Sequence, residues 1–335
     1  MQTFINILLT VLIFLVIILI HEFGHFISAK LCGVKVNEFS IGMGPSIFKK
    51  QGKETLYNVR LFPIGGFVSM EGEDATSNDP RAFNNQNIIK RIIIICAGAF
   101  MNLILGFVVI LIIVSTMNVI PTNTISAVEP ETLMAQSGLM AGDTVLKVNG
   151  RTIFVTNDIS YELMHDEDCD VSMLVKRNGE KITLNSVRFD PKKGLGIKVL
   201  AEEKGFFNTL SYSARYSLCI GRLIWVSLID LLSGRASVND LSGPVGMTQV
   251  VGDAVKVGIP NLTLLLAFIT INCGIFNLLP IPALDGGRLF FLIVEAIRGK
   301  PIKPEYEGYI HLVGFALVIL LMIFVTFNDI LKLFR

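Results

Sequence analysis

Charged residues are scarce in this sequence. Only 17% of its 335 residues are Asp, Glu, Lys or Arg, whereas soluble proteins carry about 25%. The formal net charge of +1 leaves no basic excess for binding nucleic acid, so no nucleic-acid partner is expected. In place of charge, 52% of the residues are hydrophobic and the mean hydropathy is +0.61. These values indicate an integral membrane protein with several spans and at least one folded soluble domain.

Cysteine is also sparse and shows no pattern. The five cysteines include no C-x-x-C pair, so neither a disulfide framework nor a cysteine zinc site is predicted. A bridge between Cys169 and Cys219 stays open as an alternative in an oxidising compartment. The first apolar run has no basic residue before it and no A-x-A site after it. It is therefore predicted to be a retained span and not a cleaved signal peptide.

Four apolar stretches predict transmembrane helices. Each approaches or exceeds the roughly 20 residues that a helix needs to cross the hydrocarbon core. They lie at residues 1–31, 88–117, 259–287 and 308–330. The predicted fold class is an α-helical polytopic membrane protein with four transmembrane helices, an inserted α+β domain and a membrane-associated β-hairpin element.

The first predicted span carries three titratable side chains within five residues: His21, Glu22 and His25. Such groups are unfavourable inside a bilayer, so they are functional hypotheses by default. Their spacing is H-E-x-x-H, which puts both histidines on one helix face, where they can bind a single zinc ion. Glu22 is then close enough to act as a general base on a water molecule at the metal.

The third predicted span contains a second polar cluster, which ends at Asp285. Pro280 and Pro282 break the helix before it. A carboxylate together with two histidines is a ligand set of catalytic zinc sites, so Asp285 is the predicted third ligand. As an alternative, Asp285 caps a helix that begins at Gly286. His311 is predicted to lie at the membrane interface and not to be a ligand.

The second predicted span contains Gly98, Ala99 and Asn102. The two small residues permit another helix to approach closely. A polar side chain in lipid needs a partner, and two interpretations of Asn102 stay open. It forms a hydrogen bond between helices, or it faces the metal cavity and holds the substrate backbone.

Residues 206–258 are apolar in part but include charged side chains. If this segment crossed the membrane, the next span would run in the opposite direction and Asp285 would lie on the far side from His21. We therefore predict amphipathic helices that lie in the membrane interface. The loops after the first and third spans are rich in Lys and Arg, which predicts that they, and the metal site, lie on the cytoplasmic side.

Two polar segments separate the apolar stretches. Residues 32–87 alternate short β-prone runs with Gly and Pro, which favours hairpins at the membrane edge over an ordinary connecting loop. Residues 122–200 contain two Asn-Gly turns and are predicted to form a small extracytoplasmic α+β domain. The segment S-G-L-M-A-G-D-T-V-L-K-V-N-G resembles PDZ domains, and residues 194–197 resemble their carboxylate-binding loop. The alternative is a structural domain that binds no peptide.

Together these motifs resemble the site-2 protease family of intramembrane zinc metalloproteases, most closely its bacterial RseP-type branch, here with a single PDZ domain. The resemblance rests on His21-Glu-Phe-Gly-His25, Gly98-x-x-x-Asn102 and Asn277-Leu-Leu-Pro-Ile-Pro-Ala-Leu-Asp285-Gly. It implies bound Zn²⁺, with His21, His25 and Asp285 as ligands and Glu22 as catalytic base. It further implies substrate contacts at Asn102, Asn277, Pro280, Gly65, Gly66 and Phe67, the last three in strands similar to the family's membrane-reentrant β-element.

The function implied is cleavage of transmembrane segments in single-span proteins that another protease has already cut, such as anti-sigma factors and remnant signal peptides. The location implied is the bacterial inner (plasma) membrane, with the lipid bilayer as a partner. Two alternative functions are less consistent with the sequence. A zinc transporter needs polar residues along a path through the whole membrane, whereas here they gather on one side. A non-catalytic PDZ scaffold has no need of Glu22.

Overall fold

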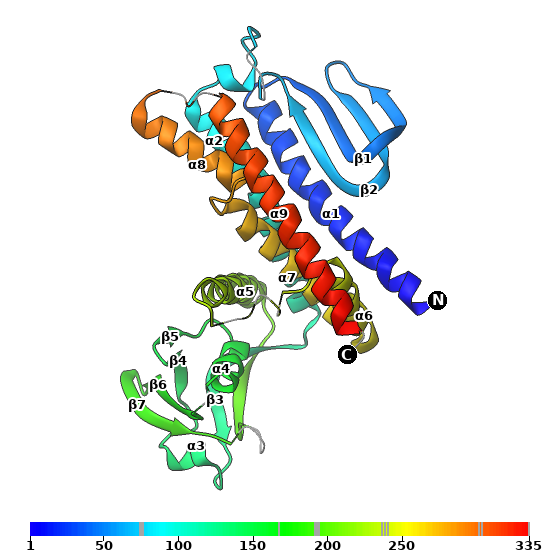
Figure 1. Cartoon of the computed structure of the whole chain (residues 1–335). Helices are drawn as coiled ribbons and strands as arrows, with labels where there is room; N and C mark the ends of the chain where they lie inside the picture. Colours follow the sequence, from blue (N-terminus) through cyan, green and yellow to red (C-terminus); the bar gives the residue numbers. More distant parts are fainter. Residues whose placement is uncertain are drawn as a thin grey trace. The chain divides into compact units, whose positions relative to one another are not determined.

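The computed structural model describes residues 1–73, 77–166, 168–190, 195–235, 237, 239, 241–300, 302 and 304–333 (Figure 1). The chain divides into two compact units. The first combines Met1–Val109 with Val226–Arg335, and the second is Ile110–Trp225.

Four helices in the described part of the chain are long and apolar enough to cross a membrane, which confirms the predicted number of spans. They are α1 (Gln2–Leu31), α2 (Ile88–Thr116), α7 (Ile259–Leu278) and α9 (Pro304–Leu333). α7 ends earlier than the predicted range 259–287, because Pro280 and Pro282 follow it and a proline inside a helix removes a hydrogen bond. A separate helix, α8 (Asp285–Arg298), begins after this break.

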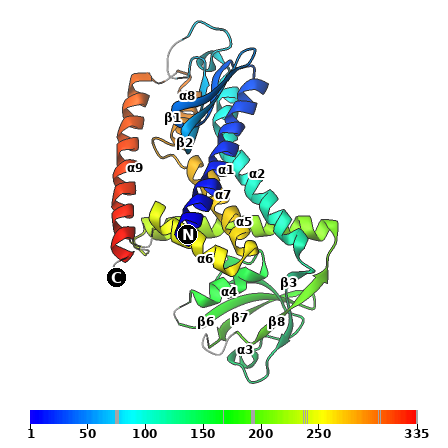
Figure 2. The same cartoon turned by 90° about the vertical axis from the view of Figure 1, so that its right-hand side faces the viewer.

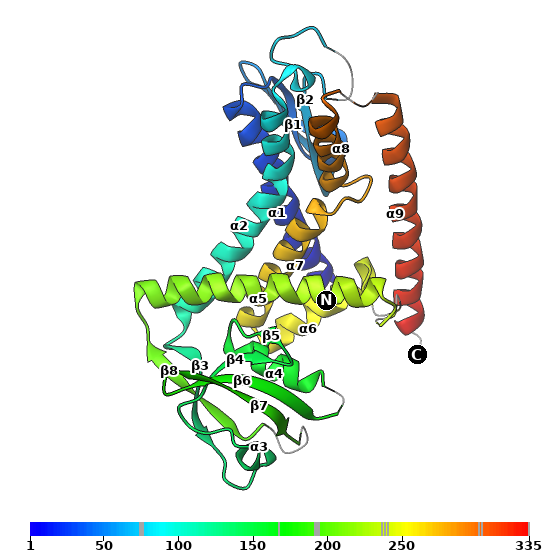
Figure 3. The ribbon, with the colours of Figure 1, turned by 90° about the vertical axis from the view of Figure 1, so that its left-hand side faces the viewer.

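The first unit is a helical bundle in which α6 (Pro244–Val257) lies beside α1 and α7 (Figure 2). Ile13 and Ile17 of α1, Val251 of α6 and Ile269 of α7 share one buried cluster. α9 lies to the side of α7 and α8 (Figure 3). Only 11% of the most apolar stretch of α9 is buried inside the protein, against 39% of the corresponding stretch of α2. α9 is therefore a peripheral helix of the bundle.

The segment after α1 forms the predicted strands and not an irregular loop. β1 (Val36–Gln51) and β2 (Leu56–Met70) are antiparallel and pack on α1. Residues 38–41 have partners in both 56–59 and 66–69. The first half of β1 therefore lies between the two halves of β2, and the second half of β2 forms an edge of the sheet.

The second unit is an α+β domain with the strand order β7-β6-β4-β3-β8, and β5 pairs with β4. Its elements are β3 (Val119–Val128), α3 (Leu133–Gln136), β4 (Thr144–Val148), β5 (Arg151–Thr152), α4 (Thr156–Met164), β6 (Asp170–Arg177), β7 (Glu180–Arg188) and β8 (Ile197–Glu203). Both predicted Asn-Gly turns are present, with φ of 47° and 76° at Asn149 and Gly150. Positive φ at both positions is the requirement of a type I′ hairpin turn.

A buried ion pair fixes the Gly-Asp turn of this domain. The Asp143 side chain is fully buried, and its carboxylate accepts hydrogen bonds from Arg177 Nε at 2.7 Å and from the Met140 N–H at 3.0 Å. Burial alone raises the pKa of Asp143, but these hydrogen bonds outweigh burial and hold the pKa below its usual value. The turn therefore stays anchored by an ionised carboxylate at neutral pH.

Helix α5 (Phe206–Leu232) follows β8, and it is not among the four candidate spans. Its interfacial position stays a prediction. Within the second unit, Cys219 Sγ donates to Asp158 Oδ1 of α4 at 2.7 Å, and burial raises the pKa of this thiol. Cys219 and Cys169 are both free thiols, so the alternative of a bridge between them is wrong. The two thiols have different partners: Cys219 is buried against the Asp158 carboxylate, and Cys169 Sγ lies 4.0 Å from the Asp166 carbonyl oxygen.

Candidate metal centre

One face of α1 presents the two histidines of the H-E-x-x-H motif. His21 and His25 lie one helical turn apart, and their Nε2 atoms are 3.2 Å from each other. The His25 side chain is buried, and its Nδ1 lies 2.9 Å from the Ile94 carbonyl oxygen. This carbonyl accepts the Nδ1 proton, which leaves the lone pair of Nε2 available to a metal.

Asp285 completes the cluster from α8. Its Oδ2 atom lies 3.0 Å from His21 Nε2 and 3.2 Å from His25 Nε2. The three ligand atoms all lie within 4.8 Å of one another. The helix cap is Leu284, and Asp285 is the first residue of the helix. Asp285 therefore does not occupy the cap position. Its carboxylate lies against both histidines, as the ligand interpretation requires.

Two glycines allow the chain to bring Asp285 to this place. A Cβ atom on Gly286 would lie 1.9 Å from the Leu279 carbonyl oxygen, and one on Gly287 would lie 2.7 Å from the Ile281 carbonyl oxygen. Both distances are far below van der Waals contact. The Asp-Gly-Gly sequence is thus a packing requirement of the sharp connection between α7 and α8.

The donor set fits zinc. Two imidazole nitrogens and one carboxylate oxygen are the protein ligands of open catalytic zinc sites, in which a fourth position stays available. The fixed tautomer of His25 supports the same conclusion, because ligating histidines almost always bind a carbonyl or carboxylate through their other nitrogen. The cluster is therefore suited to hold Zn²⁺ through His21, His25 and Asp285.

Asn102 of α2 is completely buried beside this cluster. Its Nδ2 atom lies 3.4 Å from His21 Nδ1, and its Oδ1 atom has no hydrogen-bond partner among the described residues. When His21 binds metal through Nε2, its Nδ1 carries a proton and needs an acceptor. The nitrogen and oxygen of an asparagine amide can exchange places by a half-turn of the amide. With its oxygen toward His21, the Asn102 amide accepts the Nδ1 proton, and both Asn102 Oδ1 and His21 Nδ1 have a partner. Asn102 thus links α1 and α2 beside a candidate ligand.

We expect Asn102→Leu to weaken zinc binding about 10- to 100-fold, as loss of such an outer partner generally does. Asn102→Asp, which keeps an acceptor oxygen, should lose much less. Zinc affinity measured by chelator competition on the purified protein checks this. Equal losses in the two variants would contradict the acceptor role.

A cavity of about 830 Å³ opens next to the cluster. Glu22 lines it beside both histidines and Asp285, and the Val68 main-chain N–H forms a hydrogen bond with the Glu22 carboxylate. The edge residues 67–70 of β2 line the same cavity. The cavity therefore brings a candidate base, a candidate metal site and an edge of the β1–β2 sheet together.

The other predicted site residues take different positions. Phe67 lines the cavity, and a Cβ atom on Gly66 would lie 3.2 Å from Glu22 Cγ. Gly65 has φ of 83° and packs on Met43. Asn277 lies within α7 and donates to Cys273 Sγ at 3.4 Å. Pro280, Asn277 and Asn102 do not line this cavity.

Sequence reasoning missed two residues at the site. It placed His311 at the interface with no site nearby, whereas His311 of α9 lines the cavity. It assigned Gly98 to helix packing and to the G-x-x-x-N motif, whereas a Cβ atom on Gly98 would lie 2.3 Å from His25 Nε2, so Gly98 packs directly against the histidines. No local pattern reveals these contacts, since both join segments that lie far apart in the sequence.

These features define a class of protein: a multi-pass membrane protein with a metalloprotease site at its helices. The chain belongs to peptidase family M50, whose profile matches residues 9–321. The Bacillus subtilis regulator of sigma-W protease RasP is 30% identical over 97% of this chain and 98% of its own length. A zinc metalloprotease RasP from Shouchella clausii is 32% identical over 96% and 98%. A putative zinc metalloprotease from Clostridium acetobutylicum is 38% identical over 98% of both.

The protein is therefore an intramembrane zinc metalloprotease of the site-2 type. The predicted enzyme class and the predicted zinc dependence are confirmed. The transporter and the non-catalytic scaffold are not favoured.

Proposed function

We propose that His21, His25 and Asp285 hold the zinc ion, that Glu22 is the catalytic base, and that the edge of β2 holds the substrate. The observation that carries this proposal is the convergence of all three in one cavity. The protein then hydrolyses a peptide bond in a transmembrane segment next to a strand edge.

Zinc in such a site would act as a Lewis acid: it would polarise the carbonyl group and lower the pKa of a water molecule, so that this water can lose a proton and attack near neutral pH. Glu22 removes a proton from the attacking water and delivers it to the leaving amine. Asp285 and the two histidines would hold the metal, and with it the reacting peptide bond, beside the Glu22 carboxylate. A zinc ion held by these three residues would have room for a water molecule or the substrate carbonyl.

The substrate must become extended before it can react, because a helix hides its carbonyl groups in hydrogen bonds. The N–H groups of Val68 and Met70 face Glu22 and Glu73, with Met70 N 3.4 Å from Glu73 Oε2. They alternate along the strand and point toward the cavity. An extended peptide that adds to this edge can satisfy these donors, as in other cases of strand addition.

A crosslinking experiment tests this edge. In a Glu22→Gln background, a single-span substrate with one cysteine should form a disulfide with Ser69→Cys on the cavity edge. The matched control is Lys49→Cys, which lies in the half of β1 that pairs only with 56–60, at the opposite edge. Several-fold more crosslinking at residue 69 is expected, above the background of the native cysteines. Equal crosslinking at both edges contradicts the docking proposal.

We propose single-span membrane proteins already cut by another protease as substrates, including anti-sigma factors and remnant signal peptides. The B. subtilis relative is named as the regulator of sigma-W protease, which supports a substrate connected with sigma-factor control. The metal site would face the cytoplasm, because the loops on either side of it are rich in Lys and Arg.

We propose that the second unit is an extracytoplasmic PDZ domain. Its α+β sheet, its Gly-Asp turn and its Asn-Gly hairpins support this. Of the predicted carboxylate-binding loop, Gly194 lies outside the described residues, and Leu195–Ile197 lead into β8. A peptide ligand would add beside β8, which pairs only with β3 among the described strands.

A further inference from the structure

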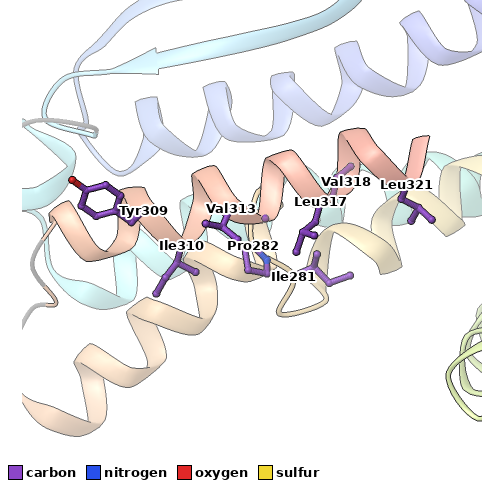
Figure 4. Close-up of a pocket in the computed structure, with 9 residues that line it drawn as sticks. Ile281, Pro282, Tyr309, Ile310, Val313, Leu317, Val318 and Leu321 are labelled. Atoms are coloured by element: carbon purple, nitrogen blue, oxygen red, sulfur yellow. The ribbon is translucent and has the colours of Figure 1, made fainter. Parts of the chain in front are cut away.

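The connection between α7 and α8 is held from outside by α9. His311 Nδ1 accepts a hydrogen bond from the Ala283 N–H at 3.0 Å. One turn further along α9, Gly314 meets the connection so closely that a Cβ atom would lie 2.3 Å from Pro282 Cβ. Figure 4 shows Ile281 and Pro282 beside the α9 side chains Val313 and Leu317.

Ala283 has a backbone conformation that alanine disfavours. Its φ is 79°, in the left-handed region, which only glycine enters without strain. Alanine has no polar side chain that compensates locally, so the surroundings must hold this conformation. The hydrogen bond from its own N–H to His311 is one such constraint.

His311 contacts the chain on both sides of Asp285. It binds the N–H of Ala283 before Asp285, and a Cβ atom on Gly287 after Asp285 would lie 3.2 Å from His311 Cε1. The His311 ring thus lies against the chain before and after Asp285, where the backbone sets the direction of the Asp285 carboxylate. Its own helix is peripheral, so this is a contact between a loosely packed span and the metal cluster.

We propose that His311 is a positioning residue for the zinc site: it accepts the Ala283 N–H, fixes the left-handed conformation of that residue and thereby places Asp285 against His21 and His25. This inference rests on the ligand set proposed above. It makes α9 part of the metal site without adding a ligand.

A packing role is the alternative. The ring centre of His311 lies 5.7 Å from that of Phe291, so any flat side chain could fill the same space. The two roles differ in one property, an acceptor atom at the position of Nδ1. Asparagine places its amide at about this position, glutamine places it at about the position of Nε2, and phenylalanine keeps a flat ring without an acceptor.

Zinc affinity of His311→Asn, His311→Gln and His311→Phe separates these roles. It is measured by chelator competition on the purified full-length protein, together with thermal unfolding of the metal-free form. We expect the Asn variant to bind zinc nearly as the parent does, and the Gln and Phe variants to bind it about 10- to 100-fold more weakly. Metal-free unfolding should change little in the Asn and Gln variants.

A second variant tests the backbone directly. Glycine adopts a positive φ without strain, so Ala283→Gly should restore much of the zinc affinity that His311→Phe loses. The control is Tyr309→Leu on the same turn of α9, where the side chain is 69% exposed and zinc affinity should not change.

Two results overturn the proposal: parent-like zinc affinity in both His311→Gln and His311→Phe, or equal losses in the Asn and Phe variants with no rescue by Ala283→Gly. His21→Ala is run in parallel. If that variant keeps full zinc affinity, the ligand assignment itself fails, and this outcome is distinct from a failure of the positioning role alone.

Discussion

Glu22→Gln should stop peptide hydrolysis and leave zinc bound. The amide keeps the size of the carboxylate but cannot accept a proton from water. Loss of general base catalysis generally lowers rates by about 10²- to 10⁴-fold. The three proposed ligands are untouched, and the Val68 N–H can still donate to the amide oxygen, so the site should keep its shape.

Cleavage of a model single-span substrate in proteoliposomes, with zinc content measured on the same preparation, checks this expectation. Glu54→Gln is the matched control, because Glu54 pairs with Lys30 at 2.7 Å and with Arg81 and does not line the cavity. Hydrogen bonds from Lys30 and Arg81 lower the pKa of Glu54 to about 2, so this control replaces a carboxylate that is ionised at neutral pH. Full cleavage by Glu22→Gln would exclude Glu22 as the base.

Gly98→Ala should have the second large effect. A Cβ atom on Gly98 would lie 2.3 Å from His25 Nε2 and 2.8 Å from His21 Cε1. Both atoms belong to the rings of the proposed ligands, so at least one ring must move. A displacement of about 1 Å at a reacting site can lower activity about 10²-fold. Helix propensity alone would predict that Gly98→Ala stabilises α2, because alanine is favoured over glycine in a helix by about 1 kcal/mol.

The measurement is again zinc affinity together with substrate cleavage. Gly205→Ala, just before α5, is the control, since nothing lies within 4 Å of a Cβ atom there and Gly205 does not line the cavity. We expect that variant to keep zinc and activity. Parent-like zinc binding by Gly98→Ala would show that the histidines bind metal in an arrangement different from the one described.

The metal motif and the spans were readable from the sequence because their signals are local. Two histidines at positions i and i+4 lie on one face of any helix, so their proximity follows from the helix alone. A long apolar run needs only its length. The position of Asp285 near the histidines could be anticipated because a carboxylate in an apolar stretch is unfavourable unless a cation or another polar group binds it. The Asn-Gly hairpins followed from backbone preferences of two adjacent residues.

The remaining parts of the site could not be predicted this way. His311 was placed away from the site, because its partner is a main-chain N–H with no sequence signal. The folded-back pairing of β1 and β2 depends on register, which composition does not specify.

The sequence by itself thus determined that this is a multi-pass membrane protein with a zinc-binding motif, since apolar length and helical periodicity are properties of single segments. Only the tertiary structure decided what surrounds that motif. The approach of Gly98 to the histidines, the contact of Asn102 with His21 and the support of Ala283 by α9 join segments far apart in the chain. Such contacts arise from close packing between helices, which no single segment encodes.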